Sequence, residues 1–276
     1  MLREYSNEDR KQIATLIVAD IKVSENGLDT ATDKALYAVV WEDNGTVSGF
    51  GSLRRWSTDG CADLYLYVAP KARRQGIGSA LLLSLTDRAE REGLTFLHAR
   101  ESATETGFFE KHGFSLWYEE LDISYAGDPL PDSDIETVPY TDEWFEAYAT
   151  GLGESFYEMR KANDFRPHLC CTPDEKTKKA FHELETNTTL LISDGSLTGA
   201  VSVNGGEIED LFVTQEYQGM GLGRKLLCHA VNIALSNGEK KVKLSVVGWN
   251  KRALKLYESA GFETFRKNRF YSFGRQ

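Results

Sequence analysis

The pattern of apolar residues along the chain is the same in both halves, and it predicts the same elements in the same order. In each half, two short apolar runs flank a dipeptide, Asn44-Gly45 or Asp194-Gly195. These dipeptides tolerate the positive φ angles that a two-residue hairpin turn needs at both central positions. The pattern predicts one β-hairpin per half, with strands near Leu36–Trp41 and Thr46–Leu53, and at Thr189–Ser193 and Leu197–Val203.

The same series of elements is expected after each hairpin. A strand ends at Val68 or Val213, a glycine-rich turn follows, and a helix begins with leucines at helical spacing. A further strand is predicted at Phe96–Arg100 and at Val242–Val247, then a short helix that ends at a Gly-Phe pair. A last hairpin is expected to close each half. A strand-helix-strand run predicts a parallel pair inside a mixed α/β sheet.

The two halves are copies of one domain. Val68–Ser79 matches Val213–Arg224 at an offset of 145 residues, and Phe109–Phe114 matches Tyr257–Phe262 at an offset of 148. A third block, Asn44–Gly49, recurs before these in the same order. Ordered blocks with small length changes indicate a duplication. We predict an N-terminal domain at 1–126, a linker at 127–134 and a C-terminal domain at 135–276.

The predicted linker, Gly127–Asp134, is rich in residues that favour turns. It holds two prolines and three aspartates and has no hydrophobic period. Proline removes backbone donors, and aspartate bonds its own backbone in turns. The segment therefore suits a connection between two domains.

Composition narrows the class of partner. Hydrophobic residues make up 41% and charged residues 27% of the 276 residues, and the net charge is −10. This acidity argues against nucleic acid as a partner and weakly favours cationic substrates. No apolar run is long enough for a transmembrane helix and the start has no signal-like segment, so we expect neither membrane association nor export.

The cysteines fit a reducing compartment. The chain has four, namely Cys61, Cys170, Cys171 and Cys228, and none forms a C-x-x-C pair. We predict reduced thiols in a cytoplasmic protein. His168 lies near two of them, but neighbouring residues point in different directions, so no metal site is expected.

The glycine-rich turn of the C-terminal copy has the features of an anion site. An apolar strand ends at Val213, and Gly221-Leu222-Gly223 opens a helix whose first N–H groups lack internal partners. Glycine lets the backbone approach an anion closely, which predicts a pyrophosphate cradle. Arg224 stands where a dinucleotide fingerprint has its third glycine, and the Gly-Lys-Ser/Thr of a Walker A loop is missing.

The full spacing resembles the GNAT superfamily of N-acetyltransferases, whose signature is Gln or Arg, two residues, Gly, one residue, and Gly or Ala. It occurs as Arg73-x-x-Gly76-x-Gly78 and again as Gln218-x-x-Gly221-x-Gly223. The resemblance covers nearly the whole chain. It implies two tandem GNAT acyl-CoA N-acyltransferase folds, organised as in mycothiol-synthase-type enzymes, in which the second half is active.

The resemblance also implies a co-substrate, acetyl-CoA, and the residues that hold it. In this family the strand before the turn splays from the next parallel strand, and the pantetheine arm pairs with its backbone as an added strand would. That assigns pantetheine contacts to Leu211, Phe212 and Val213, and in the N-terminal copy to Leu66, Tyr67 and Val68. The Val213 N–H, or a neighbouring one, would polarise the thioester carbonyl.

The pyrophosphate contacts follow from the same resemblance. In the C-terminal copy they fall on Gln218, Gly219, Met220, Gly221, Leu222, Gly223 and Arg224, and Asn250 fits the family's asparagine near the CoA arm. In the N-terminal copy they fall on Arg73, Arg74, Gln75, Gly76, Ile77, Gly78 and Ser79. No metal is implied.

Amine acetylation needs a base for the ammonium and an acid for the leaving thiolate. The resemblance places the acid at Tyr257 and the base at Glu207 or Glu209, which alternation sets on the same face as Val213. At the matching positions the N-terminal copy has Phe109, Ala62 and Leu64, with Ser102 opposite Asn250. We therefore expect the C-terminal copy to be catalytic and the N-terminal copy to be degenerate.

Several alternatives stay open at this point. Tyr257 also fits a core tyrosine, Glu207 and Glu209 fit a solvent-facing strand, and water serves as base in some family members. Tyr65 or Tyr67 offers the N-terminal copy another hydroxyl. The acceptor is a small-molecule or peptide amine, and its identity and the oligomeric state are not determined.

Two other functions compete with a small-molecule N-acetyltransferase. One is acetylation of a protein N-terminus or lysine, and the other is a non-catalytic CoA-binding sensor or scaffold. Aromatic residues before Lys179, including Trp144, Phe156, Tyr157 and Phe165, together with Met159, either line an acceptor pocket or belong to the core. We expect the core.

Overall fold

The structure is a computed structural model that describes residues 1–21, 32, 34–55, 60–102, 107–131, 134–181 and 187–274. Its contacts divide the chain into two compact units. Unit 1 comprises Met1–Tyr118 and Arg269–Gln276, and unit 2 comprises Glu119–Asn268. These units are defined by contacts, whereas the copies are defined by sequence, so the domain boundaries drawn from the repeat stay a prediction.

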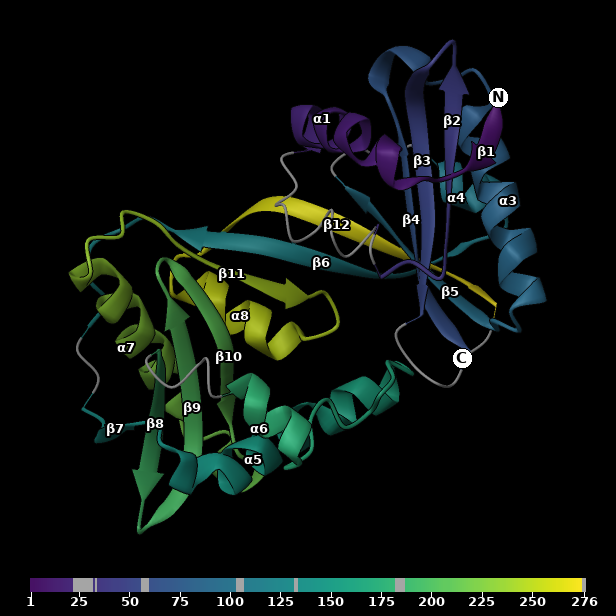
Figure 1. Ribbon diagram of the computed structural model, residues 1–276. Coiled ribbons are helices and arrows are strands. Elements are labelled where there is room, and N and C mark those ends of the chain that lie inside the picture. Colours follow the sequence, from purple (N-terminus) through teal and green to yellow (C-terminus); the bar gives the residue numbers. More distant parts are fainter. Residues whose placement is uncertain are drawn as a thin grey trace. The chain divides into compact units, whose positions relative to one another are not determined.

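Unit 1 is a mixed sheet with helices (Figure 1). Its strand order is β1-β2-β3-β4-β5-β12, with β4 and β5 parallel and the β1–β2, β2–β3 and β3–β4 pairs antiparallel. Its elements are β1 (Leu2–Glu4), a 3-10 turn (Asn7–Asp9), α1 (Arg10–Ile21), β2 (Tyr37–Asp43), β3 (Thr46–Arg55), β4 (Cys61–Val68), a 3-10 turn (Pro70–Ala72), α3 (Ile77–Arg91), β5 (Phe96–Ser102), α4 (Phe108–Lys111) and the ends of β6 (Ser115–Tyr125) and β12 (Glu263–Gly274) that fall in this unit.

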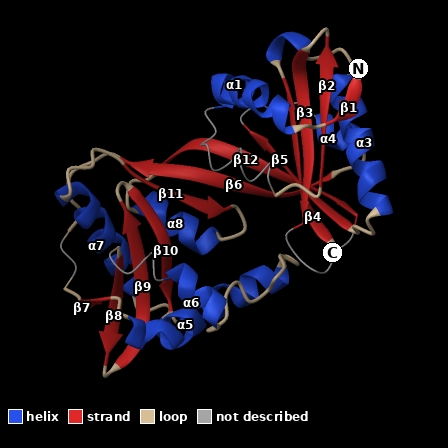
Figure 2. Ribbon diagram, in the orientation of Figure 1, coloured by secondary structure: helices blue, strands red, loops and turns tan. Residues whose placement is uncertain are grey.

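Unit 2 repeats this plan (Figure 2). Its strand order is β12-β6-β11-β10-β9-β8-β7, with β10 and β11 parallel and the β6–β11, β9–β10, β8–β9 and β7–β8 pairs antiparallel. Its elements, besides parts of β6 and β12, are β7 (Thr137–Pro139), a 3-10 turn (Asp142–Trp144), α5 (Phe145–Ala162), α6 (Glu175–Phe181), β8 (Thr188–Ser193), β9 (Ser196–Asn204), β10 (Glu207–Val213), a 3-10 turn (Gln215–Tyr217), α7 (Leu222–Ser236), β11 (Val242–Val247) and α8 (Lys251–Ser259).

The predicted mixed α/β fold and its hairpins are confirmed. Asn44 and Gly45 have φ angles of 50° and 79°, and Asp194 and Gly195 have 50° and 75°. Gly113 and Gly261 end their helices with φ angles of 83° and 91°, which only glycine adopts readily. The dipeptide signals therefore set these turns as expected.

The prediction of a closing hairpin is wrong. One long strand follows each Gly-Phe pair, β6 in the first half and β12 in the second. Neither strand contains an Asn-Gly, an Asp-Gly or a proline that would force a reversal. A single uninterrupted strand is the physical result.

Part of the predicted linker is fixed to unit 2. The Leu130 N–H donates to Asn232 Oδ1 at 2.9 Å, and Asn232 Nδ2 donates to the Leu130 carbonyl at 3.0 Å. Asn232 lies on α7, so this stretch docks on a helix of the unit. Residues 132 and 133 lie outside the described part.

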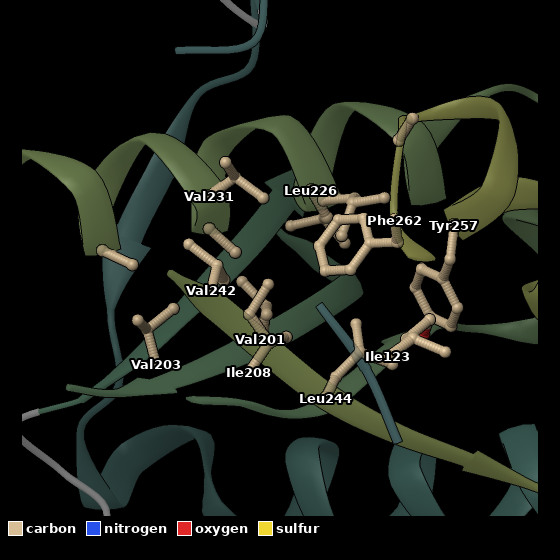
Figure 3. Packing of buried hydrophobic residues seen from close by; sticks show 14 of the residues in the cluster. Ile123, Val201, Val203, Ile208, Leu226, Val231, Val242, Leu244, Tyr257 and Phe262 are labelled. Carbon is tan, nitrogen blue, oxygen red and sulfur yellow. The ribbon is translucent and has the colours of Figure 1, made fainter. Parts of the chain in front are cut away.

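Unit 2 has hydrophobic cores on both faces of its sheet. On the α7 face, Leu226, Leu227 and Val231 pack against Val201 and Ile208 (Figure 3). On the α5 face, Tyr148 and Leu152 pack against Ala200 and Phe212. The strands are therefore buried on both sides, which explains their nearly continuous apolar runs. Among the described residues no helix has the length and hydrophobicity to cross a membrane.

Candidate active site

The two signature loops close in the same way. Gln218 Nε2 donates to the Val213 carbonyl at 3.0 Å, and Arg73 Nε donates to the Val68 carbonyl at 2.8 Å. Each side chain thus ties the loop to the last residue of its strand. A long donor side chain is needed at this position, which gives a physical reason for Gln or Arg in the signature.

Glycine opens both helices in the left-handed region. Gly76 and Gly221 each have φ 81°, and no side-chain hydrogen bond caps either helix. A Cβ atom at Gly219 or Gly221 would meet nothing within 4 Å. The backbone of this loop is therefore open at a helix N-terminus, as an anion cradle requires.

A large cavity of unit 2 lies against this loop. Its volume is about 1090 Å³, and residues of β10 and β11 line it together with the loop, α5 and α8. Within the described part of the chain, β10 and β11 pair at Glu207 and Lys243 and carry no further paired residues. The cavity follows the point where these parallel strands diverge.

Most of the predicted C-terminal site residues line this cavity. They are Leu211, Phe212, Val213, Gln218, Gly219, Gly221, Leu222, Gly223, Arg224, Asn250 and Tyr257. Met220 is 65% exposed and is not among the lining residues, nor are Glu207 and Glu209.

The end of β10 presents its backbone to the gap. The Thr214 N–H donates to the Thr198 carbonyl on β9 at 3.0 Å. Because neighbouring residues of an extended strand point their N–H groups to opposite edges, the Val213 N–H faces away from β9. The Val213 carbonyl accepts from Gln218 and from Ser155 Oγ at 3.2 Å. This geometry suits a donor aimed at a bound carbonyl.

Tyr257 combines a packed ring with a place on the cavity wall. The residue is 7% exposed, and its ring centroid lies 5.9 Å from that of Phe262 (Figure 3). Burial raises the pKa of Tyr257 to about 12, so its hydroxyl keeps the proton near neutral pH. Asn250 also has a local role, because its Oδ1 accepts from the Ala253 N–H at 3.1 Å and caps α8.

A β-bulge reverses the faces of β10. The register with β9 shifts between Glu209 and Phe212, and Asp210 has φ 48°. Ile208, Leu211 and Val213 all pack against the α7-side core, whereas Phe212 packs on the α5 side. The expectation that Glu207 and Glu209 share the face of Val213 is therefore wrong, because one extra residue changes the alternation.

The bulge carries an acid that the sequence analysis did not single out. Asp210 lines the cavity, and burial raises the pKa of its carboxyl. Burial, followed by the charges of Asp210 and Glu207, also raises the pKa of Glu209. Aspartate is disfavoured inside strands, so an Asp within β10 was a usable signal.

Cations at the start of α8 were also missed. Lys251 and Arg252 line the cavity next to Asn250, and Arg252 Nη1 donates to Gln218 Oε1 at 2.8 Å. This bond orients the amide whose nitrogen holds Val213. Two adjacent cations at a helix start beside a glycine-rich turn are a readable sign of anion binding.

The aromatic residues before Lys179 divide between core and cavity. Phe156 and Met159 line the cavity, and both Phe156 and Trp144 pack against the α5-side core. The rings of Phe165 and Trp249 lie 5.8 Å apart, and Trp249 lines the cavity. The expectation of core holds for Trp144 but not for Met159.

Unit 1 lacks these acids at the matching places. Phe109, Ala62 and Leu64 are buried in its core, and the register of β3 with β4 is continuous, without a bulge. The Tyr67 hydroxyl donates to the Leu16 carbonyl at 3.0 Å, and Ser79 Oγ lies 3.0 Å from His112 Nε2. The Ser102 side chain lies outside the described part.

The described residues contain no group of three or more His, Cys, Asp or Glu side chains with the geometry to hold a metal ion. None of the four cysteines forms a disulfide bond.

These features define a class of protein. The Acetyltransferase (GNAT) family model matches residues 6–114 and 139–262, one match in each copy. The chain belongs to this family, and the family model matches it twice.

Two relatives are similar to the chain in different ways, one over a short segment and the other over most of its length. A thialysine N-epsilon-acetyltransferase from Bos taurus is 41% identical over 54 residues, which are 20% of this chain and 32% of the relative, so the match spans about a third of that protein. A mycothiol acetyltransferase from Stackebrandtia nassauensis is 27% identical over 253 residues, covering 82% of this chain and 78% of the relative.

A solved structure shows the same tandem fold. The tandem GNAT protein from the clavulanic acid biosynthesis pathway superposes with a TM-score of 0.71 at 18% identity, covering 99% of this chain and 98% of that one. The likeness at this identity concerns the fold.

Proposed function

We propose that unit 2 transfers the acetyl group of acetyl-CoA to a primary amine of a small molecule, by direct attack in a ternary complex. One observation carries the proposal. A single cavity is lined by an anion cradle, a diverging strand edge, a protonated tyrosine and a half-buried carboxyl group. Unit 1 has the loop but lacks the acids at the matching places, which supports a non-catalytic role for it.

The residues on the cavity wall fit acetyl-CoA. Backbone groups of Gln218–Gly223 suit the pyrophosphate, with Lys251 and Arg252 as nearby cations, and Leu211–Val213 suit the pantetheine arm. When bound, acetyl-CoA supplies an activated acetyl thioester. The Val213 N–H is the donor that polarises its carbonyl.

Proton handling falls to two side chains. Asp210, directly or through water, takes the proton of the incoming ammonium, and its raised pKa suits a base near neutral pH. Glu207, Glu209 and water remain alternative bases. Tyr257 gives a proton to the departing thiolate, which its high pKa supports because the hydroxyl stays protonated.

The relatives support a small amine as acceptor. They are named as a thialysine N-epsilon-acetyltransferase and a mycothiol acetyltransferase, and neither name gives a protein substrate. An acidic chain with a carboxylate in its cavity favours a cation. We also propose a cytoplasmic location, supported by four cysteines that form no disulfide bond.

The test is thiol release from acetyl-CoA with a panel of amines, run on the parent and on Tyr257→Phe. The substitution keeps the ring, so packing should change little. Loss of a general acid costs about 10²–10⁴ in rate, so kcat should fall while the KM for acetyl-CoA changes less than about tenfold. Tight CoA binding without turnover on any amine would instead indicate a sensor, and an undiminished Tyr257→Phe would make the tyrosine a packing residue.

A further inference from the structure

Ser245 lines the cavity and has no role in the proposed mechanism. Leu244 and Val246 of β11 are buried in the α7-side core, so Ser245 between them points to the opposite face. Ser245 is exposed and lines the cavity. Ile123 of β6 also packs in the α7-side core, so Asp122 lies on the same face as Ser245.

Asp122 is buried, and both of its carboxylate oxygens accept hydrogen bonds. It is 4% exposed, its Oδ1 accepts from Ser245 Oγ at 2.6 Å, and its Oδ2 accepts from Asn268 Nδ2 at 3.1 Å and from Arg266 Nε. Burial acts to raise the pKa of this carboxyl, but the hydrogen bonds from Ser245 and Arg266 outweigh it and hold the pKa below its usual value. The carboxylate therefore stays charged at neutral pH.

This arrangement fixes the role of the serine. A hydroxyl has one hydrogen to donate and two lone pairs to accept with. The hydrogen of Ser245 is committed to a charged acceptor, which makes a strong bond. Toward the cavity, Ser245 Oγ is left with lone pairs alone, so it favours a donor such as an ammonium and disfavours a carbonyl or carboxylate.

We propose that Ser245, held as a hydrogen-bond acceptor by Asp122, receives a bond from a second N–H group of the acceptor. The inference rests on the proposed function and deepens it. The site then takes acceptors of the diamine type, in which one nitrogen reacts and another is anchored, in preference to monoamines. Ser245 is a specificity-determining residue, and Asp122 is a positioning residue that acts through it.

Ser245→Ala tests the role of the hydroxyl, and Ser245→Thr restores it. We would measure binding by calorimetry, in the presence of CoA, of 1,4-diaminobutane and of 1-aminobutane as a control of equal length. Ser245→Ala should weaken diamine binding about tenfold or more and change monoamine binding less than about twofold, because it removes a bond to a charged donor. Ser245→Thr should retain most of the affinity. A melting curve checks the fold of each variant.

Asp122→Asn tests the positioning role. An amide at this place donates to Ser245 and frees its hydroxyl to turn as a donor toward the cavity, so the diamine preference should fall with little change in the affinity for CoA measured by calorimetry. The inference is overturned if Ser245→Ala weakens the binding of both amines equally, or of neither, or if the parent binds no diamine. These binding measurements need no turnover, so absence of thiol release with every amine contradicts the proposed function separately.

Discussion

Asp122, which is buried, and Asp210, which is half-buried, lie on one sheet of unit 2 and have opposite electrostatic roles. Burial raises the pKa of Asp210, whereas hydrogen bonds outweigh burial and lower the pKa of Asp122. A raised carboxyl pKa means that the fold favours the protonated form, and a lowered one means that it favours the charged form. Asp210 is thus held at a cost to stability, as a functional group often is, and Asp122 contributes to stability.

The opposite pKa shifts of Asp210 and Asp122 predict how the stability of their variants depends on pH. Asp210→Asn should melt above the parent at pH 7, and the difference should shrink as the pH falls from the raised pKa toward the ordinary aspartate pKa, because the parent loses stability as the pH rises through that window. Asp122→Asn should melt below the parent at pH 7, with a deficit that narrows in acid. Melting curves from about pH 2 to pH 8 check both signs, since the Asp122 deficit narrows only below the ordinary aspartate pKa of about 4. A destabilised Asp210→Asn at pH 7 would contradict this account.

Residue identities were partly predictable. Tyr257 and the signature residues of the C-terminal copy follow from the repeat and the resemblance, and most of them line the cavity. Asp210 was missed because strict alternation places it on the face of Ile208, away from the glutamates. The bulge that turns it is set by the pairing of β10 with β9, which a single strand does not encode.

At the scale of elements, the two loops reach one conformation from different residues. The second signature position is Gly219 with φ 85° in unit 2 and Arg74 with φ 64° in unit 1. A left-handed conformation costs a residue with a Cβ atom roughly 1 kcal/mol or more, whereas glycine adopts it freely. The N-terminal loop therefore keeps its shape under backbone strain.

Arg74→Gly should relieve this strain. We expect the free energy of unfolding to rise by about 1 kcal/mol or less, since glycine also gains freedom in the unfolded chain. Gly219→Ala, the matched change in the other loop, should lower it by about 1 kcal/mol. Urea titrations measure both. A loss of stability in Arg74→Gly would show that contacts of the arginine outweigh its backbone cost.

The hairpins and the main helices were predictable because their signals are local. Dipeptides such as Asn44-Gly45 fix a turn by the φ angles that they tolerate, and leucine spacing marks α3 and α7. The single long strand that replaces the expected closing hairpin was not predictable. An uninterrupted run such as Ser115–Tyr125 fits one long strand or two short ones until its partners are known.

At the scale of the whole molecule, the repeat and the compact units do not share boundaries. Residues 119–125 of β6 precede the predicted linker, yet they belong to unit 2, where they pair with β11. Residues 269–274 of β12 end the second copy, yet they belong to unit 1. Sequence repeats show which segments are copies, but the partner of a strand depends on long-range pairing.

The measurement that tests the central claim most directly compares the two signature loops. Gly221→Glu puts a side chain and a negative charge into the anion cradle of unit 2, and Gly76→Glu makes the same change at the same φ in unit 1. With an amine that the parent acetylates, thiol release should fall by more than about 10²-fold in Gly221→Glu and keep most of its rate in Gly76→Glu. If Gly76→Glu abolishes thiol release while its melting curve matches the parent's, the chemistry belongs to unit 1 and the account is wrong.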